Sequence, residues 1–171
     1  HTSSVKDLST TRGLSKLRGL LQSSSSWRSM EPGDGGYWYY SNFGFCVLGT
    51  TLELAADRLL DDYLQERFLQ PMGIRATFYS GNMEEDEVAT LYTTGGIGRS
   101  AAEHAGQTVP TEIGMGASYY PGGFTVSAVD MAKLVSVLIN DGTYQGTQYL
   151  TPESVAAMET PQFTVDPRET S

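Results

Sequence analysis

The chain has 171 residues, of which 39% are hydrophobic and 18% charged, and its formal net charge at pH 7 is −9. This composition is ordinary for a globular protein and the length suffices for one domain with a sizeable core, while no apolar run approaches the roughly 18 residues that a membrane-spanning helix needs. The charge is uneven: five basic residues and one acidic residue up to Met30 give +4, and the remaining six basic and nineteen acidic residues give −13. We expect no nucleic acid as a partner, because the acidic bulk of the chain would repel phosphate.

Residues 1–36 are predicted to form a loop region that wraps over another part of the protein, because they are rich in Ser, Thr and Gly and carry dense turn chemistry at 31–36. One short helix is expected within this region, over 14–21. The sequence shows no signal peptide and begins at His1. We therefore expect a processed product or a piece of a longer chain, with any targeting segment upstream.

A pair of helices is predicted over 37–73. The first begins at 41–42, where Ser or Asn can cap it, and ends near Ala56. The second begins near Asp57 as its N-cap and ends at 71–73, where Pro and Gly stop it. The apolar stripe that the first helix is expected to bury, at helical spacing, consists of Phe45, Leu48 and Leu52.

Residues 74–118 are predicted to be variable loops and short strands, with the acidic run 84–87 as a solvated loop. The helical pattern returns over 119–160 and a polar tail follows at 161–171. After a tight turn at 119–123, a helix is expected from Ser127 to Ile139, and Thr151 with Pro152 opens a further short helix. Ser127 and Asp130 fit a capping box, and the predicted buried stripe consists of Met131, Leu134, Val135 and Leu138.

The sequence gives little support for a metal site or a disulfide. Cys46 is the single cysteine, which rules out an intramolecular disulfide and a cysteine-cluster zinc site, and its apolar neighbours predict a buried thiol. The two histidines are too few and too far apart for a metal site, and His104 is expected on the surface. The run 84–87 lacks the EF-hand pattern. We therefore predict no metal and no cofactor.

The triplet Tyr40-Ser41-Asn42 stands at the start of an apolar helix and can place a phenol and an amide on one small patch. A free tyrosine titrates near ~10, so it is a poor base at neutral pH. A neighbouring ammonium would favour the phenolate, and Tyr40 could then act as general base for a serine hydroxyl. Asn42 could orient that ammonium or hold a substrate carbonyl. By itself the triplet also fits ordinary packing before a helix.

The neighbours of the triplet resemble, in collinear order, the serine β-lactamase family of the class C type, which includes D-alanyl-D-alanine carboxypeptidases, D-aminopeptidases and related esterases. No single motif carries this resemblance, which is specific as a set and covers most of the chain. The matching stretches are His1-Thr2-Ser3, Pro32-Gly33, Tyr40-Ser41-Asn42 with Gly44, Leu48-Gly49 and Glu53, Phe68 with Pro71-Met72-Gly73-Ile74, Gly122-Gly123-Phe124, Ser127-Ala128 with Asp130-Met131, Gly142 with Gly146, Leu150 to Val155, and Met158.

The resemblance implies a mainly helical chain with a few short strands, namely the helical subdomain of the serine β-lactamase/transpeptidase-like fold with its central sheet largely missing. In that family a serine of an S-x-x-K motif is the nucleophile, and a K-T-G or H-x-G strand helps bind substrate. Only Tyr40, as catalytic general base, and Asn42, as substrate-binding residue, carry over. The literal Ser3-Ser4-Val5-Lys6 is not expected to be the nucleophile, because it overlaps the His-Thr-Ser stretch that follows the true nucleophile helix. Nothing after Met158 matches the strand motif.

We therefore expect the middle of an acyl-enzyme hydrolase that is inactive alone and meets its nucleophile on other parts of the same protein. The substrate would be a β-lactam, a D-amino-acid peptide or an ester, and the resemblance favours an extracytoplasmic location. An apolar surface is expected where those parts pack, with self-association as a consequence. The alternative is a non-catalytic module of this family that binds a ligand or partner through its tyrosine-rich turns.

Overall fold

The computed structural model describes residues 7–27 and 40–161. This part of the chain is mainly helical with a few short strands, as the sequence predicts. The literal S-x-x-K stretch from Ser3 to Lys6, which is not expected to be the nucleophile, lies outside the described residues, as do the turn at 31–36 and the tail after 161. The α-helices of the described residues are α1 (Leu14–Gln22), α2 (Asn42–Ala56), α3 (Leu60–Leu64), α4 (Ala101–Ala105), α5 (Ala128–Ile139) and α6 (Pro152–Glu159).

The strands form three separate two-stranded antiparallel ladders within the described residues. Tight helical turns connect the larger elements, and a π-helical turn extends α3 from Gln65 to Leu69. The strands are β1 (Ala76–Thr77) with β4 (Thr125–Val126), β2 (Leu91–Thr93) with β3 (Gly96–Arg99), and β5 (Thr143–Tyr144) with β6 (Thr147–Gln148). The 3-10 turns are η1 (Leu8–Thr11), η2 (Ser24–Ser26), η4 (Ser80–Asn82), η5 (Glu85–Glu87) and η6 (Ala117–Tyr119).

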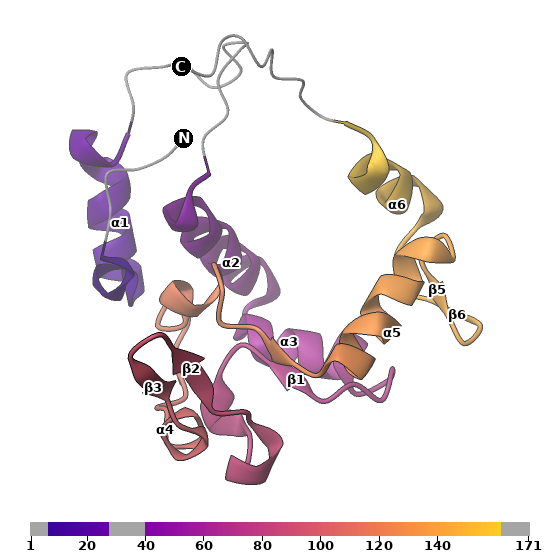
Figure 1. The fold of residues 1–171 in the computed structure, drawn as a ribbon. Helices are drawn as coiled ribbons and strands as arrows, with labels where there is room; N and C mark the ends of the chain where they lie inside the picture. The colour runs from indigo at the N-terminus through magenta and orange to yellow at the C-terminus, as the bar shows by residue number, and fades with distance from the viewer. Residues whose placement is uncertain (1–6, 28–39, 162–171) are drawn as a thin grey trace, which may run out of the picture.

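The elements follow a curve (Figure 1), with α1 and α2 on one side, α3 and β1 in the middle, and α5, the β5–β6 hairpin and α6 on the other side; the β2–β3 hairpin and α4 lie below α2 in this view. The core is divided along this curve. Leu17 of α1 packs with Phe43 and Cys46 of α2, whereas Val137 of α5 packs with Leu69 and the residues that follow α3. No helix of the described residues is both long enough and apolar enough to cross a membrane.

Helix α2 begins at the residues that the sequence predicts, but it buries a different face from the predicted one. The Ser41 side chain accepts from the Gly44 amide at 3.0 Å, and Asp57 ends the helix in the left-handed region with φ 50°. Asp57 is therefore not the N-cap of the next helix, α3. The N-cap of α3 is Leu59. The prediction of a buried Phe45, Leu48 and Leu52 stripe is wrong for this chain, because the three are 45%, 53% and 46% exposed. The side chains that α2 buries are instead those of Phe43, Cys46, Thr50 and Glu53.

For helix α5, as for α2, the predicted N-cap is confirmed and part of the predicted buried stripe is wrong. Ser127 caps it by accepting from the Asp130 amide at 3.0 Å, but the Asp130 carboxylate pairs with Lys133 at 2.7 Å and does not close a capping box. Met131 and Val135 are 40% and 44% exposed, and Val137 is the residue that the helix buries. Thr151 and Pro152 open α6 as expected. Capping is a local property that the sequence carries, whereas the choice of buried face depends on the neighbouring surface.

Candidate functional site

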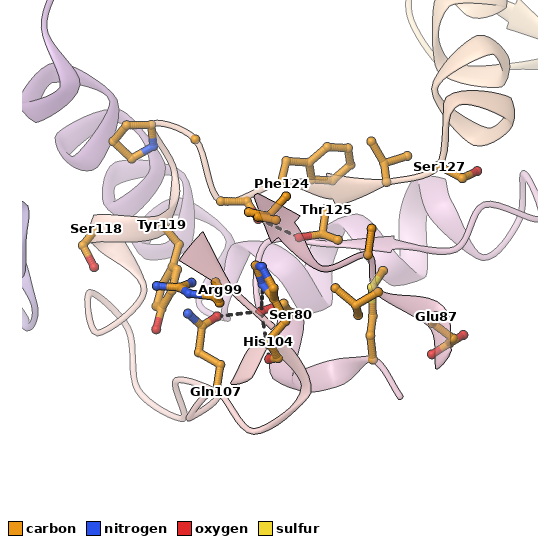
Figure 2. Close-up of a pocket in the computed structure, with 18 of the residues that line it drawn as sticks. Ser80, Glu87, Arg99, His104, Gln107, Ser118, Tyr119, Phe124, Thr125 and Ser127 are labelled. Atoms are coloured by element: carbon orange, nitrogen blue, oxygen red, sulfur yellow. Dashed lines mark hydrogen bonds between the residues drawn. The ribbon is translucent and has the colours of Figure 1, made fainter. Parts of the chain in front are cut away.

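An open cleft of about 1060 Å³ runs between the N-terminal turn η1, the start of α2, and the loops on either side of β1 and β4 (Figure 2). It brings together segments that are far apart in the chain. Its polar and charged lining comes from Arg12, Asn42, Arg75, Ser80, Glu87, Arg99, His104, Gln107, Ser118, Tyr119, Thr125, Ser127 and Asp130. The remainder of the lining is apolar or glycine, including Phe124 and residues 121–123.

Of the two residues that the sequence singles out, Asn42 lines this cleft and Tyr40 is not among the lining residues. Asn42 is the first residue of α2, which places it at the amino end of the helix. Tyr40 lies just before the cap, is 50% exposed, and packs its ring against Phe45 with 5.9 Å between the centroids. The structure therefore places Tyr40 and Asn42 on the same short turn, with the phenol turned toward α2.

One wall of the cleft, residues 118–123, is fixed to α2 from behind. The Tyr120 ring lies so close to Gly49 that a Cβ on that glycine would stand 2.0 Å from Tyr120 Cδ2. The Tyr120 hydroxyl donates to Glu53 Oε1, and Phe78 meets the same ring edge-on at 5.3 Å between centroids. The absence of a side chain at position 49 is thus a requirement of the contact between α2 and this wall.

Glu53 is a fully buried carboxylate, with 0% of its surface exposed, and its partners are donors without charge. Besides the Tyr120 hydroxyl, it accepts from the Gly114 amide at 2.8 Å and the Leu60 amide at 3.3 Å. Tyr79 extends the network through a 2.9 Å hydroxyl contact with Tyr120. Burial raises the pKa of both tyrosines far above the usual range, and the hydrogen bond to Glu53 adds to the shift at Tyr120. Both phenols therefore stay protonated and keep donating.

The carboxylates that line the cleft are neutralised by partners. Arg75 donates to both carboxylate oxygens of Glu87 at 2.7 Å, and these hydrogen bonds lower the pKa of Glu87 to about 2. Asp130 pairs with Lys133 and also accepts from the Arg75 amide at 3.3 Å. The hydrogen bond from Lys133 is the main cause that lowers the pKa of Asp130. Both acids are therefore ionised and paired at neutral pH.

Arg12 is held at the rim of the cleft. Its Nε donates to Ser118 Oγ at 3.0 Å, one Nη donates to the Tyr119 hydroxyl at 3.4 Å, and the guanidinium lies 5.2 Å from the centre of the Tyr119 ring. These contacts link the N-terminal segment to the wall formed by 118–123. A neighbouring backbone bond from the Gly13 amide to the Gly114 carbonyl, at 2.8 Å, supports the same junction.

The base of the cleft contains a polar cluster of Ser80, His104 and Gln107 (Figure 2). The Ser80 hydroxyl lies 2.9 Å from Gln107 Oε1 and 3.0 Å from the His104 carbonyl, and His104 Nδ1 lies 3.4 Å from Ser80 Oγ. His104 is only 9% exposed, so the prediction of a surface histidine is wrong. The helix α4 is only one turn long and packs against η4 and η5, which covers its histidine. Burial, and then the charge of Arg99, lower the pKa of His104.

The described residues form a helical part of the β-lactamase and penicillin-binding-protein type of fold. A Beta-lactamase family profile matches residues 1–170, so the chain belongs to the Beta-lactamase family. The structure of the octameric penicillin-binding protein homologue from Pyrococcus abyssi resembles this one with a TM-score of 0.58 at 21% identity, over 85% of this chain and 30% of that chain. This likeness supports the fold.

Two proteins of Mycobacterium tuberculosis are similar to this chain in sequence. Protein Rv1367c of Mycobacterium tuberculosis (strain ATCC 25618 / H37Rv) is 32% identical over 122 residues, and the Uncharacterized protein MT1414 of strain CDC 1551 / Oshkosh has the same identity over the same length. The match covers 69% of this chain and 29% of either relative. The chain therefore spans less than a third of the length of the proteins that it resembles.

Sequence reasoning missed most of what shapes the cleft. In the sequence, Gly49 and Glu53 stand out only through the family resemblance, and Tyr120 only as part of the turn at 119–123. A carboxylate in the middle of an apolar helix was the signal that could have marked Glu53, because a buried charge needs partners. Arg12 and His104 carried no comparable signal, since their contacts come from residues far away in the chain.

Proposed function

We propose that this chain is the helical part of a serine hydrolase that works through an acyl-enzyme on a small-molecule or peptide substrate, a β-lactam, a D-amino-acid peptide or an ester. In this proposal residues 1–171 form one subdomain, and Tyr40 acts as general base while Asn42 binds substrate and orients a lysine. The nucleophilic serine and that lysine come from a segment outside these 171 residues. The observation that carries the proposal is that Asn42 opens α2 at the edge of a large cleft in a chain of the Beta-lactamase family.

The arrangement of polar groups fits acyl transfer. An amide at the mouth of a cleft can hold a substrate carbonyl, and a tyrosine two residues earlier can exchange a proton with a hydroxyl brought next to it. The wall at 118–123 gives the substrate a surface to lie against. It is fixed to α2 through Glu53 and Tyr120, so the wall and the Tyr40–Asn42 turn keep one relative position.

The exposed apolar side chains support the need for a further segment. Phe45, Leu48 and Leu52 follow one face of α2 with about half of each side chain in solvent. A helix stripe of that kind normally packs against a partner. We propose that the remaining parts of the same protein cover it, and that copies of the isolated chain associate through it. The octameric state of the archaeal homologue is in keeping with association within this family.

The test compares the 171-residue chain with a longer form that includes the flanking segments of its gene. Hydrolysis of a chromogenic lactam and of a p-nitrophenyl ester is followed for each. We expect turnover by the longer form and none by the 171-residue chain. In the longer form, Tyr40→Phe should lower kcat by about 100-fold or more, the scale of a lost proton transfer. The matched control is Tyr92→Phe, an equally conservative change on the exposed β2–β3 hairpin. Turnover by the short chain that Tyr40→Phe abolishes would place the nucleophile within these residues and refute the proposal.

The same longer sequence separates the enzyme from the alternative of a binding module. An S-x-x-K motif several tens of residues before His1 supports the hydrolase, because it supplies the serine and lysine that Tyr40 and Asn42 must meet. A glycine or alanine in place of that serine would favour a protein that binds without chemistry.

A further inference from the structure

Residues 101–107, which are helix α4 and the two residues after it, are held against the turn η4 at the base of the cleft. The Ser80 hydroxyl of η4 lies 3.0 Å from the His104 carbonyl and 2.9 Å from Gln107 Oε1. The next residue, Gly81, meets the same segment so closely that a Cβ there would overlap the Gln107 carbonyl oxygen. The segment and η4 therefore fit together only while these polar contacts are kept.

The hydrogen bonds around Ser80 determine which nitrogen of the neutral His104 ring carries the proton. A hydroxyl has one hydrogen to donate, and the two oxygens next to Ser80 Oγ are both carbonyl acceptors. The lone pairs of Ser80 Oγ are therefore left for His104 Nδ1, which lies 3.4 Å away. It follows that Nδ1 is the protonated nitrogen of the neutral ring and that Nε2 is an acceptor.

The second nitrogen of the ring, Nε2, is buried without a partner. His104 is 9% exposed, and Nε2 has no hydrogen-bond partner among the described residues. A buried acceptor without a partner costs some free energy, but a buried N–H that carries a charge costs far more. Protonation of His104 would create such an N–H at Nε2, and the positive charge of Arg99 would oppose it further. The closed arrangement therefore suits the neutral ring and not the protonated one.

The charged groups near the His104 ring come from three elements. Burial is the largest cause of the lowered pKa of His104, Arg99 of β3 adds to it, and Glu103 of α4 opposes it. The turn η5, which packs on α4, contributes the acidic residues 85–87, whereas η4 and β4 carry no charged residue. The Glu103 carboxylate accepts from Ser100, which lowers its pKa and keeps it ionised at mildly acidic pH.

We propose that His104 is a pH-sensitive switch: its neutral ring keeps residues 101–107 against η4, and its protonation separates this segment from η4. The segment follows β3 directly (Figure 1), so its release also frees the β2–β3 hairpin. Leu91 and Arg99, at the ends of that hairpin, line the cleft. The cleft wall therefore opens under mildly acidic conditions. This inference goes beyond the proposed function, because it concerns when the cleft is open and not which bond is cleaved.

Hydrogen exchange of backbone amides, followed by NMR, measures the opening without any catalysis. The Gly106 and Gln107 amides are bonded within the segment, and the Tyr149 amide, bonded to the Gly142 carbonyl, is the reference. Each exchange rate is divided by the intrinsic rate at the same pH, which gives an opening constant. From about pH 7.5 to about pH 5 this constant should rise at Gly106 and Gln107 toward about 30-fold, the limit for a ring that binds its proton only in the open state, where its pKa is near 6.5. It should not rise in the same way at Tyr149.

Two histidine variants assign the effect. In His104→Asn the side-chain nitrogen stands where Nδ1 does and does not titrate, so the opening constants of the segment should no longer depend on pH in this range. The matched control is His1→Asn, which removes the only other histidine of the chain and should keep the rise. If His104→Asn does not fold, the parent chain and His1→Asn still decide, because the rise must appear at Gly106 and Gln107 and not at Tyr149.

Three results would overturn the proposal. They are a rise of less than about twofold in the opening constant of the segment, an equal rise at Tyr149, and a rise that persists in His104→Asn. Failure of the longer protein to hydrolyse any substrate would refute the proposed function and leave these exchange rates unchanged, so the two failures are distinguishable.

Discussion

Gly49→Ala tests whether the wall of the cleft is fixed to α2 by direct contact. A Cβ at this position would lie 2.0 Å from Cδ2, 2.5 Å from Cγ and 2.6 Å from Cε2 of Tyr120. The ring has nowhere to move, because it is 8% exposed, Phe78 packs on it, and its hydroxyl is engaged by Glu53 and Tyr79. Either the ring shifts and the hydrogen bond to Glu53 breaks, or α2 moves away from the wall.

The expected change in the free energy of unfolding is the difference between two costs and one gain. Overpacking of this kind costs about 1–3 kcal/mol, and loss of a hydrogen bond to a buried carboxylate costs about 1.5–3 kcal/mol. Replacing glycine by alanine within a helix returns about 0.5–1 kcal/mol. The net loss is therefore about 1.5–5.5 kcal/mol, which for a chain of this size corresponds to a fall in Tm of about 3–20 °C.

Gly44→Ala is the matched control, because it makes the same change in the same helix. A Cβ there would meet only Ser41 Cβ and Oγ, both at 3.5 Å, an ordinary contact. Thermal unfolding followed by circular dichroism should show Gly44→Ala close to the parent chain and Gly49→Ala well below it. If Gly49→Ala melts at or above the temperature of Gly44→Ala, the close contact between α2 and Tyr120 does not exist and the account of the wall fails.

Two further predictions concern charge and exposed apolar surface. The hydrogen bonds from Arg75 lower the pKa of Glu87 to about 2 from 4.5, so the stability that Arg75 adds is fully present above pH 4.5 and is lost as the pH falls toward 2. Urea unfolding of the parent and Arg75→Gln should therefore differ at neutral pH and converge over that window, and a constant difference would contradict the pairing. Sedimentation should show self-association of the isolated chain that Leu48→Ser reduces and Leu91→Ser, equally exposed on the hairpin, does not. A strictly monomeric parent chain would argue against the role given to the α2 stripe.

The sequence predicted the beginnings and ends of helices better than their orientation. Ser41, Ser127 and Thr151 each cap the helix that they were expected to cap, because a cap depends on a hydrogen bond to an amide only a few residues away. The sequence predicts too early a start for the second helix, because Asp57 is of a residue type that often caps a helix but here has the left-handed conformation that ends α2. A residue that can either start or stop a helix does not reveal which it does without its backbone angle.

The buried faces were predicted less well for a physical reason. Phe45, Leu48 and Leu52 have helical spacing and Met131 and Val135 share it, yet all five are at least 40% exposed. Periodicity reports that a face is suited to packing but not which surface is present to meet it. The polar site was harder still, because the Arg12–Ser118 bond joins residues 106 positions apart and the Glu53–Tyr120 bond joins residues 67 apart. A single sequence contains no record of such pairs.

The β2–β3 hairpin buries none of its residues, yet Leu91 and Arg99, at its two ends, line the cleft. Substitutions there disturb little packing, so they cost little stability. The same substitutions change the chemistry that a ligand meets. In the proposed function, this rim is therefore the place where substrate preference can change while the buried Glu53–Tyr120 junction stays intact, and where a designer would first vary the sequence to change specificity.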